Sequence, residues 1–461
     1  MKWLIASVLA IVFCAANAEE DPKITQRLAE AIVAFDYDDI PPDVVRYAKQ
    51  LMADNIAVAV GAHYVETTDL LQDIYEVNGG DHLILHSGKR GKMMEAIYLN
   101  SLAANMLDFD DGHVEVGHPG ITAIQPALVL MKQYGKSEKE LIEAVVAGYE
   151  FNIRWARAVF SYPDKFAGPW GSATLQVMGT TVTAAKLLDL NVEQIQRALF
   201  FAAGNTPLPF YQKVGLHPGQ TMSGLKNNYG QVSQAGVLAV LTALAGIPAE
   251  TTVLDGDQGQ WRMMASQAFD SEVLFAALGE RWETLDVLIK PYAACRWMHS
   301  SIDAFSSALE GVDAADIERI DVHLFRIGAN ALAGVDPQNL LDLQFSMPTI
   351  FGLLAGGHDL IDLRMRDARL PAAQSLSDKV HVHFSEHYES LFRQLKLPAK
   401  AVITLKDGTK VEHEVLDARG ARSNPLADEE HVRKVRTLID SSPHRNVRRY
   451  ARRFLPWAGT S

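Results

Sequence analysis

The segment Gln234–Ala245, which reads QAGVLAVLTALA, favours a buried helix and decides the fold class. It is apolar along its length and rich in alanine, and it is followed by Gly246 and Pro248, which stop helices. Helices rich in Ala and Gly can pack closely on several sides. The segment therefore predicts a large helical domain.

Helical patterns continue upstream of this segment. From about Asp21 to Met264 the sequence predicts one helix after another. Ser137–Glu140 and Asn191–Gln194 have the spacing of capping boxes, in which side chain and backbone at a helix start satisfy each other. The first box predicts a helix over 138–149, and the second predicts a helix through Ala203.

The pattern changes near Leu288. Apolar and polar residues alternate over 320–325 and 380–384, which is typical of half-buried strands. Residues 401–405 and 410–415, joined by Lys406–Thr409, predict a hairpin with a type I′ turn. The fold class is therefore mainly α, with a smaller α/β domain. The predicted divisions are a signal peptide over 1–18, a helical domain over 19–289, the α/β domain over 290–423, and C-terminal helices over 424–461 that rejoin the helical domain.

The composition excludes several classes of protein. Of the 461 residues, 48% are hydrophobic and 21% are charged, which does not fit a disordered, collagen-like or multi-span membrane chain. The net charge is −13, so the chain repels nucleic acid, and an acidic substrate needs a locally cationic pocket. Cys14 and Cys295, the two cysteines, are too few for a four-cysteine zinc site or an ordinary iron–sulfur cluster.

The amino terminus predicts a secretory signal peptide. Lys2 supplies positive charge, Trp3–Ala16 is almost wholly apolar, and small residues precede a cleavage point after Ala18. The apolar run is too short to span a bilayer. We therefore expect a secreted or periplasmic protein with no stable membrane anchor. The alternative is a buried first helix.

The densest polar cluster, Asp108–His113, follows the apolar stretch Ala96–Leu107 and precedes Gly117–Gly120. If the helix continues, Asp108 and Asp111 share one face, raise each other's pKa and suit proton transfer. The alternative is a solvated helix end followed by a turn.

A second candidate site is the segment Lys290–His299, KPYAACRWMH. Lys290 and Arg296 are cations that can bind substrate carboxylates, and His299 can serve as acid or base near neutral pH. Cys295 fits a packed core thiol better than a nucleophile, because no orienting partner is evident.

The sequence contains three weaker signals of a site. Lys226 precedes the long apolar helix and could meet an anion there, although exposed lysines are commoner. His381 and His383 fall on one side of a strand, where solvated histidines are commoner than metal ligands. A basic face of the terminal helix fits solvent better than an anionic partner; it comprises Arg445, Arg448, Arg449, Arg452 and Arg453.

The order of these segments resembles the MmgE/PrpD family, which includes 2-methylcitrate dehydratases, cis-aconitate decarboxylases and an iminodisuccinate epimerase. The resemblance runs from about Asp54 to Glu430. It implies a discontinuous helical domain with an α/β lid, commonly a homodimer, and catalysis without metal or organic cofactor. It rests on NSLAANMLDFDDGH…HPG, AVVAGYEFNIRWARA, GTTVTAAKLLDL, QAGVLAVL…TTVLDGDQG, KPYAACRWMHSSIDAF and LKDGTKVEHEVLDARGARSNPLADEE.

The resemblance carries the family's catalytic aspartate to Asp108 and its histidines to His118 and His299. The family's lysine aligns with Leu225, so Lys226 fills that role only through a one-residue shift. The sequence also departs from the family pattern, with Gly112 at a usual threonine, Trp170 at a frequent histidine and Thr349 at a frequent tyrosine.

These residues predict a cofactor-independent lyase for a small di- or tricarboxylic acid, first of all a dehydratase of a 2-methylcitrate-like or alkylcitrate-like hydroxy-acid. Asp108 and His299 would share proton transfer, Asp111 would orient its neighbours, and carboxylates would be bound by Lys226, Lys290, Arg296 and His118.

Other functions stay open. A cis-aconitate-type decarboxylase, an epimerase and a secreted carboxylate-binding protein that has lost catalysis all fit the same residues. A magnesium-dependent isoprenoid synthase is the rival from another class, because Asp110, Asp111 and Glu115 resemble its aspartate-rich motif. The sequence lacks that class's second metal motif.

Overall fold

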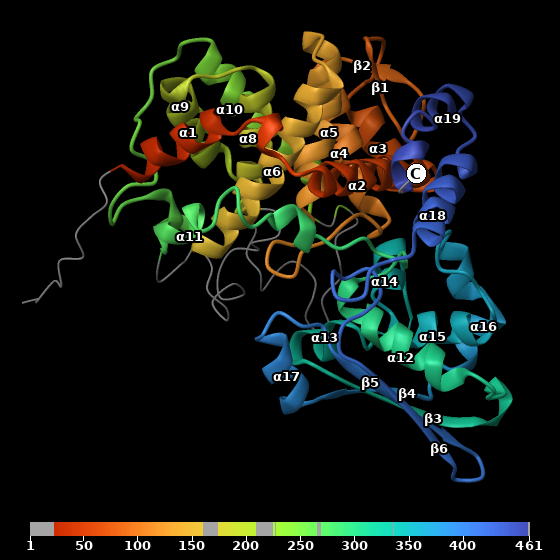
Figure 1. Cartoon of the computed structure of the whole chain (residues 1–461). Coiled ribbons are helices and arrows are strands. Elements are labelled where there is room, and N and C mark those ends of the chain that lie inside the picture. Colours follow the sequence, from red (N-terminus) through yellow and green to blue (C-terminus); the bar gives the residue numbers. More distant parts are fainter. Residues whose placement is uncertain are drawn as a thin grey trace, which may run out of the picture.

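The computed structural model describes residues 23–159, 174–208, 225, 227–264, 269–334 and 336–459. Helices predominate in this part of the chain, and the sheets are small, which confirms the predicted fold class (Figure 1). The predicted signal peptide, Trp170 and Lys226 lie outside the described residues. No helix in the described ranges has both the length and the apolar composition to cross a membrane.

The first part of the chain forms a group of helices with one short β-ladder, in the upper half of Figure 1. Both predicted capping boxes form at the starts of its helices, at Ser137–Glu140 and Asn191–Gln194. Its elements are α1 (Ile24–Ala34), α2 (Pro42–Gly61), α3 (Glu66–Ile74), β1 (His82–Leu83), β2 (Arg90–Gly91), α4 (Met93–Met106), α5 (Pro119–Tyr134), α6 (Glu138–Val159), α8 (Val177–Leu187), α9 (Val192–Asn205), α10 (Tyr229–Leu244) and α11 (Ser271–Phe275).

Glycines let these helices approach one another closely. A Cβ added to Gly236 of α10 would lie 2.6 Å from Thr180 Cβ on α8. A Cβ on Gly148 of α6 would lie 2.1 Å from Thr183 Oγ1, also on α8. Such distances are far below van der Waals contact, so only glycine fits. The close packing predicted from the Ala- and Gly-rich segments is confirmed.

The second part lies below the helices in Figure 1 and combines a sheet with short helices. Its elements are α12 (His299–Leu309), β3 (Ile317–Leu324), α13 (Arg326–Ala331), α14 (Leu340–Gln344), α15 (Met347–Ala355), α16 (Pro371–Ser375), β4 (Val380–Phe384), α17 (Glu386–Phe392), β5 (Ala399–Leu405) and β6 (Lys410–Val415).

The four strands of this sheet are ordered β4-β3-β5-β6. β3 is parallel to β4, with Val322 opposite Val382, and antiparallel to β5, with Val322 opposite Ala401. The predicted strands and hairpin are confirmed, but the predicted turn type is wrong. A type I′ turn needs positive φ at both central residues, whereas only Gly408 has one, at 88°. Gly408 N donates to Leu405 O and Leu405 N to Thr409 O, as in a type I turn followed by a glycine bulge.

The chain then returns to the helical part. α18 (Asp428–Ser441) and the 3₁₀ helix Leu455–Ala458 both pack on α2, and α19 (Arg445–Ala451) lies between them in sequence. Figure 1 shows these C-terminal helices beside α2 and α3, although they follow the sheet in sequence. The boundaries at 289/290 and 423/424 stay predictions.

Candidate active site

The aspartate-rich loop begins where α4 ends. α4 stops at Met106, and Asp108 has a φ of 46°, in the left-handed region that Asp tolerates better than most residues. The helix does not continue through Asp111, so the condition for Asp108 and Asp111 to share a helix face is not met. The left-handed backbone conformation at Asp108 instead turns the aspartates of this loop toward different partners.

Backbone pairing brings the two predicted motifs together. Gly112 and Leu288 exchange both backbone hydrogen bonds, at 3.0 and 2.8 Å. This bridge places Lys290 beside Asp108, and its Nζ lies 2.5 Å from Asp108 Oδ1 and 2.8 Å from Asp108 O. Both side chains are almost fully buried, at 1% and 2% exposure. In this conformation Lys290 is committed to Asp108, and its predicted contact with substrate stays a prediction.

Asp110 orients His118, a role that the sequence reasoning missed. His118 Nδ1 lies 2.7 Å from Asp110 Oδ2, while Asn105 Nδ2 donates to Asp110 Oδ1 at 3.0 Å. The other ring nitrogen, Nε2, lies 3.9 Å from Asp108 Oδ1. His118 is therefore placed between two buried carboxylates. The Tyr229 ring packs edge-on against the imidazole.

Asp111 lies in a different environment. It is wholly buried, and the Tyr149 hydroxyl donates to its Oδ2 at 2.7 Å. Burial, reinforced by the nearby Asp110 charge, holds the pKa of Asp111 well above its usual range. The contact leaves no space beside it, because a Cβ on Gly120 would lie 2.3 Å from the Tyr149 hydroxyl. Asp111 and Tyr149 thus pack closely against Gly120, at the start of α5, the helix that follows His118. The predicted role of Asp111 in orienting its neighbours stays a prediction.

His299 is also wholly buried, and both of its ring nitrogens have contacts. Nε2 lies 3.0 Å from Ala294 O, and Nδ1 lies 3.2 Å from Arg296 Nη1. Burial, with the charges of Arg296 and Lys290, keeps the pKa of His299 well below its usual value, so the ring is neutral. Burial also lowers the pKa of Arg296 to about 10. The proton-transfer role of His299 and the substrate contact of Arg296 stay predictions.

Profiles of known families match most of the chain. The MmgE/PrpD N-terminal domain matches residues 26–272, and the MmgE/PrpD C-terminal domain matches residues 292–453. The chain belongs to the MmgE/PrpD family. A cis-aconitate decarboxylase of Aspergillus terreus is 26% identical over 440 residues, covering 88% of this chain and 86% of its own. A cis-aconitate decarboxylase-like protein of Aspergillus oryzae is 27% identical and covers 62% of each chain. Family and relatives support a lyase-type enzyme that acts on a carboxylate.

A buried network, which the sequence reasoning also missed, supports the candidate active site of this MmgE/PrpD chain. Lys434 of α18 donates to Asp54 of α2, and to the backbone oxygens of Phe109 at 2.7 Å and Lys290 at 2.9 Å. His431 Nε2 lies 3.1 Å from Asp54 Oδ1. One ammonium thus joins both motifs to two helices. An aspartate within apolar α2 was the signal in the sequence that pointed to such a network.

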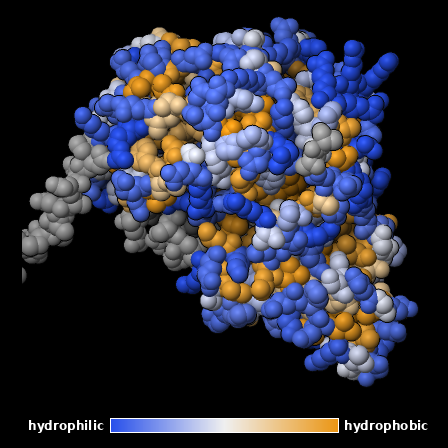
Figure 2. All heavy atoms as spheres, in the orientation of Figure 1, coloured by the Kyte–Doolittle hydropathy of each residue, from blue (hydrophilic) through white to orange (hydrophobic). Residues whose placement is uncertain are grey.

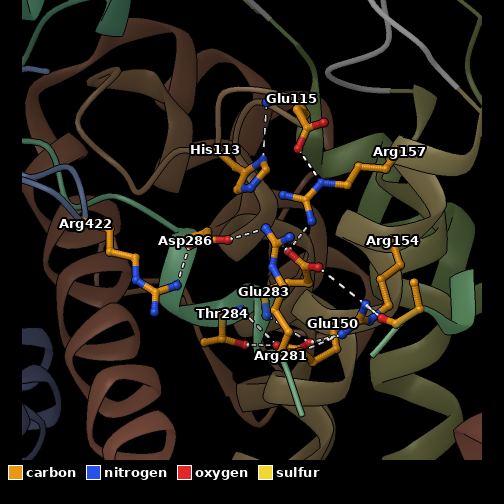
Figure 3. Close-up of polar contacts among 11 residues, drawn as sticks. His113, Glu115, Glu150, Arg154, Arg157, Arg281, Glu283, Thr284, Asp286 and Arg422 are labelled. Atoms are coloured by element: carbon orange, nitrogen blue, oxygen red, sulfur yellow. Dashed lines mark hydrogen bonds and ion pairs between the residues drawn. The ribbon is translucent and has the colours of Figure 1, made fainter. Parts of the chain in front are cut away.

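A second network holds the loop that leads into His118 (Figure 3). Glu115 of this loop accepts a hydrogen bond from Arg157 Nε at 2.5 Å, and Arg157 also contacts Glu283. Arg154 then lies 3.4 Å from both Glu283 and Glu150. The alternating charges link α6 to the segment before Leu288. Through Glu115, this network of charged side chains ties residues 113–117 to α6.

The centre could also coordinate a cation. Asp108, Asp110 and His118 each offer a ligand atom, and these atoms lie within 4.8 Å of one another. Lys290 already neutralises part of this charge. The prediction that the family centre works without metal therefore stays a prediction, which chelation tests directly.

Proposed function

We propose that the centre around Asp108 and His118 is the active site of a cofactor-independent lyase for a small di- or tricarboxylic acid. The observation that carries this proposal is the arrangement Asp110–His118–Asp108–Lys290, in which an oriented imidazole lies beside a carboxylate with its own counter-ion. His118 can then serve as the acid and Asp108 as the base, side by side. Lyase reactions of carboxylic acids need such proton transfers.

The imidazolium form of His118 suits this surrounding, because each ring nitrogen faces a carboxylate oxygen. Asp110 fixes the ring orientation through Nδ1, so Nε2–H is the proton that we assign to delivery. When a carboxylate leaves as carbon dioxide, the electron pair of the broken bond shifts into the substrate and a carbon atom takes up this proton. Lys290 Nζ supplies a counter-ion to the Asp108 carboxylate, which suits that carboxylate to the role of base.

Decarboxylation of an acid like cis-aconitate is the first candidate reaction, because two relatives that match 88% of this chain are cis-aconitate decarboxylases. Dehydration of an alkylcitrate-like hydroxy-acid, the reaction favoured in the sequence analysis, is the second. It is supported by the separation of 3.9 Å between Asp108 Oδ1 and His118 Nε2, which pairs a base for the C–H proton with an acid for the departing hydroxyl.

The test is incubation of the purified protein with cis-aconitate, citrate and 2-methylcitrate, followed by mass spectrometry. Loss of carbon dioxide identifies a decarboxylase, loss of water a dehydratase, and unchanged mass with altered chirality an epimerase. His118→Gln should lower turnover by a factor on the order of 10²–10⁴. The matched control is His413→Gln, at an exposed position on β6, which should turn over at the wild-type rate.

Full turnover by His118→Gln would refute the assignment of the proton donor. Calorimetry addresses the remaining alternative, a binding protein that has lost catalysis. Binding of these acids without conversion of any of them would contradict the proposed lyase.

A further inference from the structure

A large concavity lies away from the candidate active site. It is formed by β1, the C-terminal half of α5 and α19, and its volume is about 1470 Å³. Figure 2 shows hydrophilic side chains over the upper right of the molecule, where Figure 1 places β2 and α19. We call it the cationic groove. Its lining contains no Asp or Glu among the described residues, but six Lys and Arg side chains: Arg90, Lys132, Lys136, Arg445, Arg449 and Arg453.

Most of these cations have no acidic partner in the described part of the chain. Lys136 pairs with Glu140 and Asp189. Four of the others take part in no ion pair within the described ranges: Lys132, Arg445, Arg449 and Arg453. Like charges gathered without counter-ions repel one another, in a protein whose net charge is −13. An anionic occupant would remove this repulsion.

The floor of the groove is not purely electrostatic. Leu83, Met131 and Phe454 line it and are only partly buried, so they offer an apolar surface.

We propose that the cationic groove binds an acidic, extended polypeptide segment of a partner protein. Arg445 and Arg449 are one helical turn apart, so their side chains repeat at about 6 Å along α19. Alternate side chains of an extended chain repeat at about 7 Å. Acidic residues at every second position therefore meet successive arginines, while the residues between them face the apolar floor.

Other polyanions fit these features less well. Nucleic acids and sulfated polysaccharides supply charge but have no aliphatic side chains for the apolar floor. An anionic bilayer is flat and does not enter a concave groove. The polypeptide is thus the anionic polymer that uses both the cations and the floor.

The test is fluorescence anisotropy with the whole protein and a fluorescein-labelled peptide of alternating glutamate and leucine. We expect saturable binding that weakens as salt is raised. Arg449→Glu should weaken binding about tenfold or more, because it reverses the charge between Arg445 and Arg453 in the groove. The matched control is Arg452→Glu. Arg452 does not line the groove and pairs with Asp440, so this variant should keep the wild-type affinity.

Both variants should retain wild-type turnover and melting temperature, so the test does not depend on the proposed lyase function. Unchanged affinity of Arg449→Glu would overturn the proposal. So would equal affinity for a glutamate–serine peptide, or tighter binding of heparin or single-stranded DNA than of the glutamate–leucine peptide. Light scattering tests whether a second copy of the protein covers the groove. A wild-type dimer that Arg449→Glu converts to a monomer would contradict the proposed partner.

Discussion

Replacing Lys434 by Met tests whether the buried network holds the candidate active site together. Lys434 is 1% exposed and Asp54 is 0% exposed, and their charged atoms lie 2.7 Å apart. Methionine keeps most of the aliphatic stem but removes the ammonium. Among the side chains that the structure describes, Asp54 then keeps only the contact with His431 Nε2, at 3.1 Å, and the oxygens of Phe109 and Lys290 each lose a donor.

Removing one partner of a buried ion pair costs about 3–5 kcal/mol, because it leaves an uncompensated charge in the interior. The lost hydrogen bonds add to this cost, and the remaining contact with His431 offsets part of it, so we expect about 4 kcal/mol. At about 2–4 °C per kcal/mol for a large domain, the melting temperature should fall by roughly 10 °C.

Differential scanning calorimetry of four proteins gives the answer: wild type, Lys434→Met, Asp54→Asn and the double variant. Since the cost is that of an unpaired buried charge, Asp54→Asn in the Lys434→Met background should recover much of the lost stability. Arg436→Met, at an exposed position of the same helix, is the control and should change stability by less than about 0.5 kcal/mol. A double variant whose loss equals the sum of the two single losses would refute the reasoning.

Four further outcomes are expected. Lys290→Met should abolish turnover and cost about 3–5 kcal/mol, and Asp108→Asn in that background should restore stability but not turnover, as calorimetry and product analysis can show. The pKa of Asp111 is higher in the folded than in the unfolded protein, so protonation of Asp111 stabilises the fold. This contribution is complete below the unfolded pKa, near 4, and is lost as the pH rises toward the folded pKa. The stability of wild type relative to Asp111→Asn should therefore fall with rising pH in melting curves. Gly120→Ala should destabilise by about 1–3 kcal/mol, since its Cβ would collide with the Tyr149 hydroxyl; equal denaturant midpoints would contradict this. Prolonged treatment with a chelator should leave turnover unchanged, and loss that added magnesium restores would reassign the centre to metal chemistry.

Local patterns predicted much of the fold. The helices around Gln234–Ala245, both capping boxes and the strands of the sheet were readable, because each depends on residues close in sequence. The turn at Gly408 was misassigned because residue type alone does not separate a type I turn with a glycine bulge from a type I′ turn.

The candidate site was predictable in its location but not in its contacts. The cluster at Asp108 and the segment at Lys290 were both identified, and the structure brings them together. Their partners depend on where α4 ends, and the left-handed residue at Asp108 turned Asp110, not Asp111, toward His118. No local rule predicts the pairing of Asp54 with Lys434, because 380 residues separate them.

That separation also governs the order in which the protein can be completed. A chain emerging from the ribosome makes Asp54 long before it makes Lys434, so in a nearly full-length chain Asp54 still lacks its cation. Contacts of such high sequence separation form late and slow the folding of the domain that depends on them. The contacts of Lys434 with the aspartate loop and the Lys290 segment thus form only when the last helices dock on α2. The nascent protein is expected to remain inactive until its synthesis is almost finished.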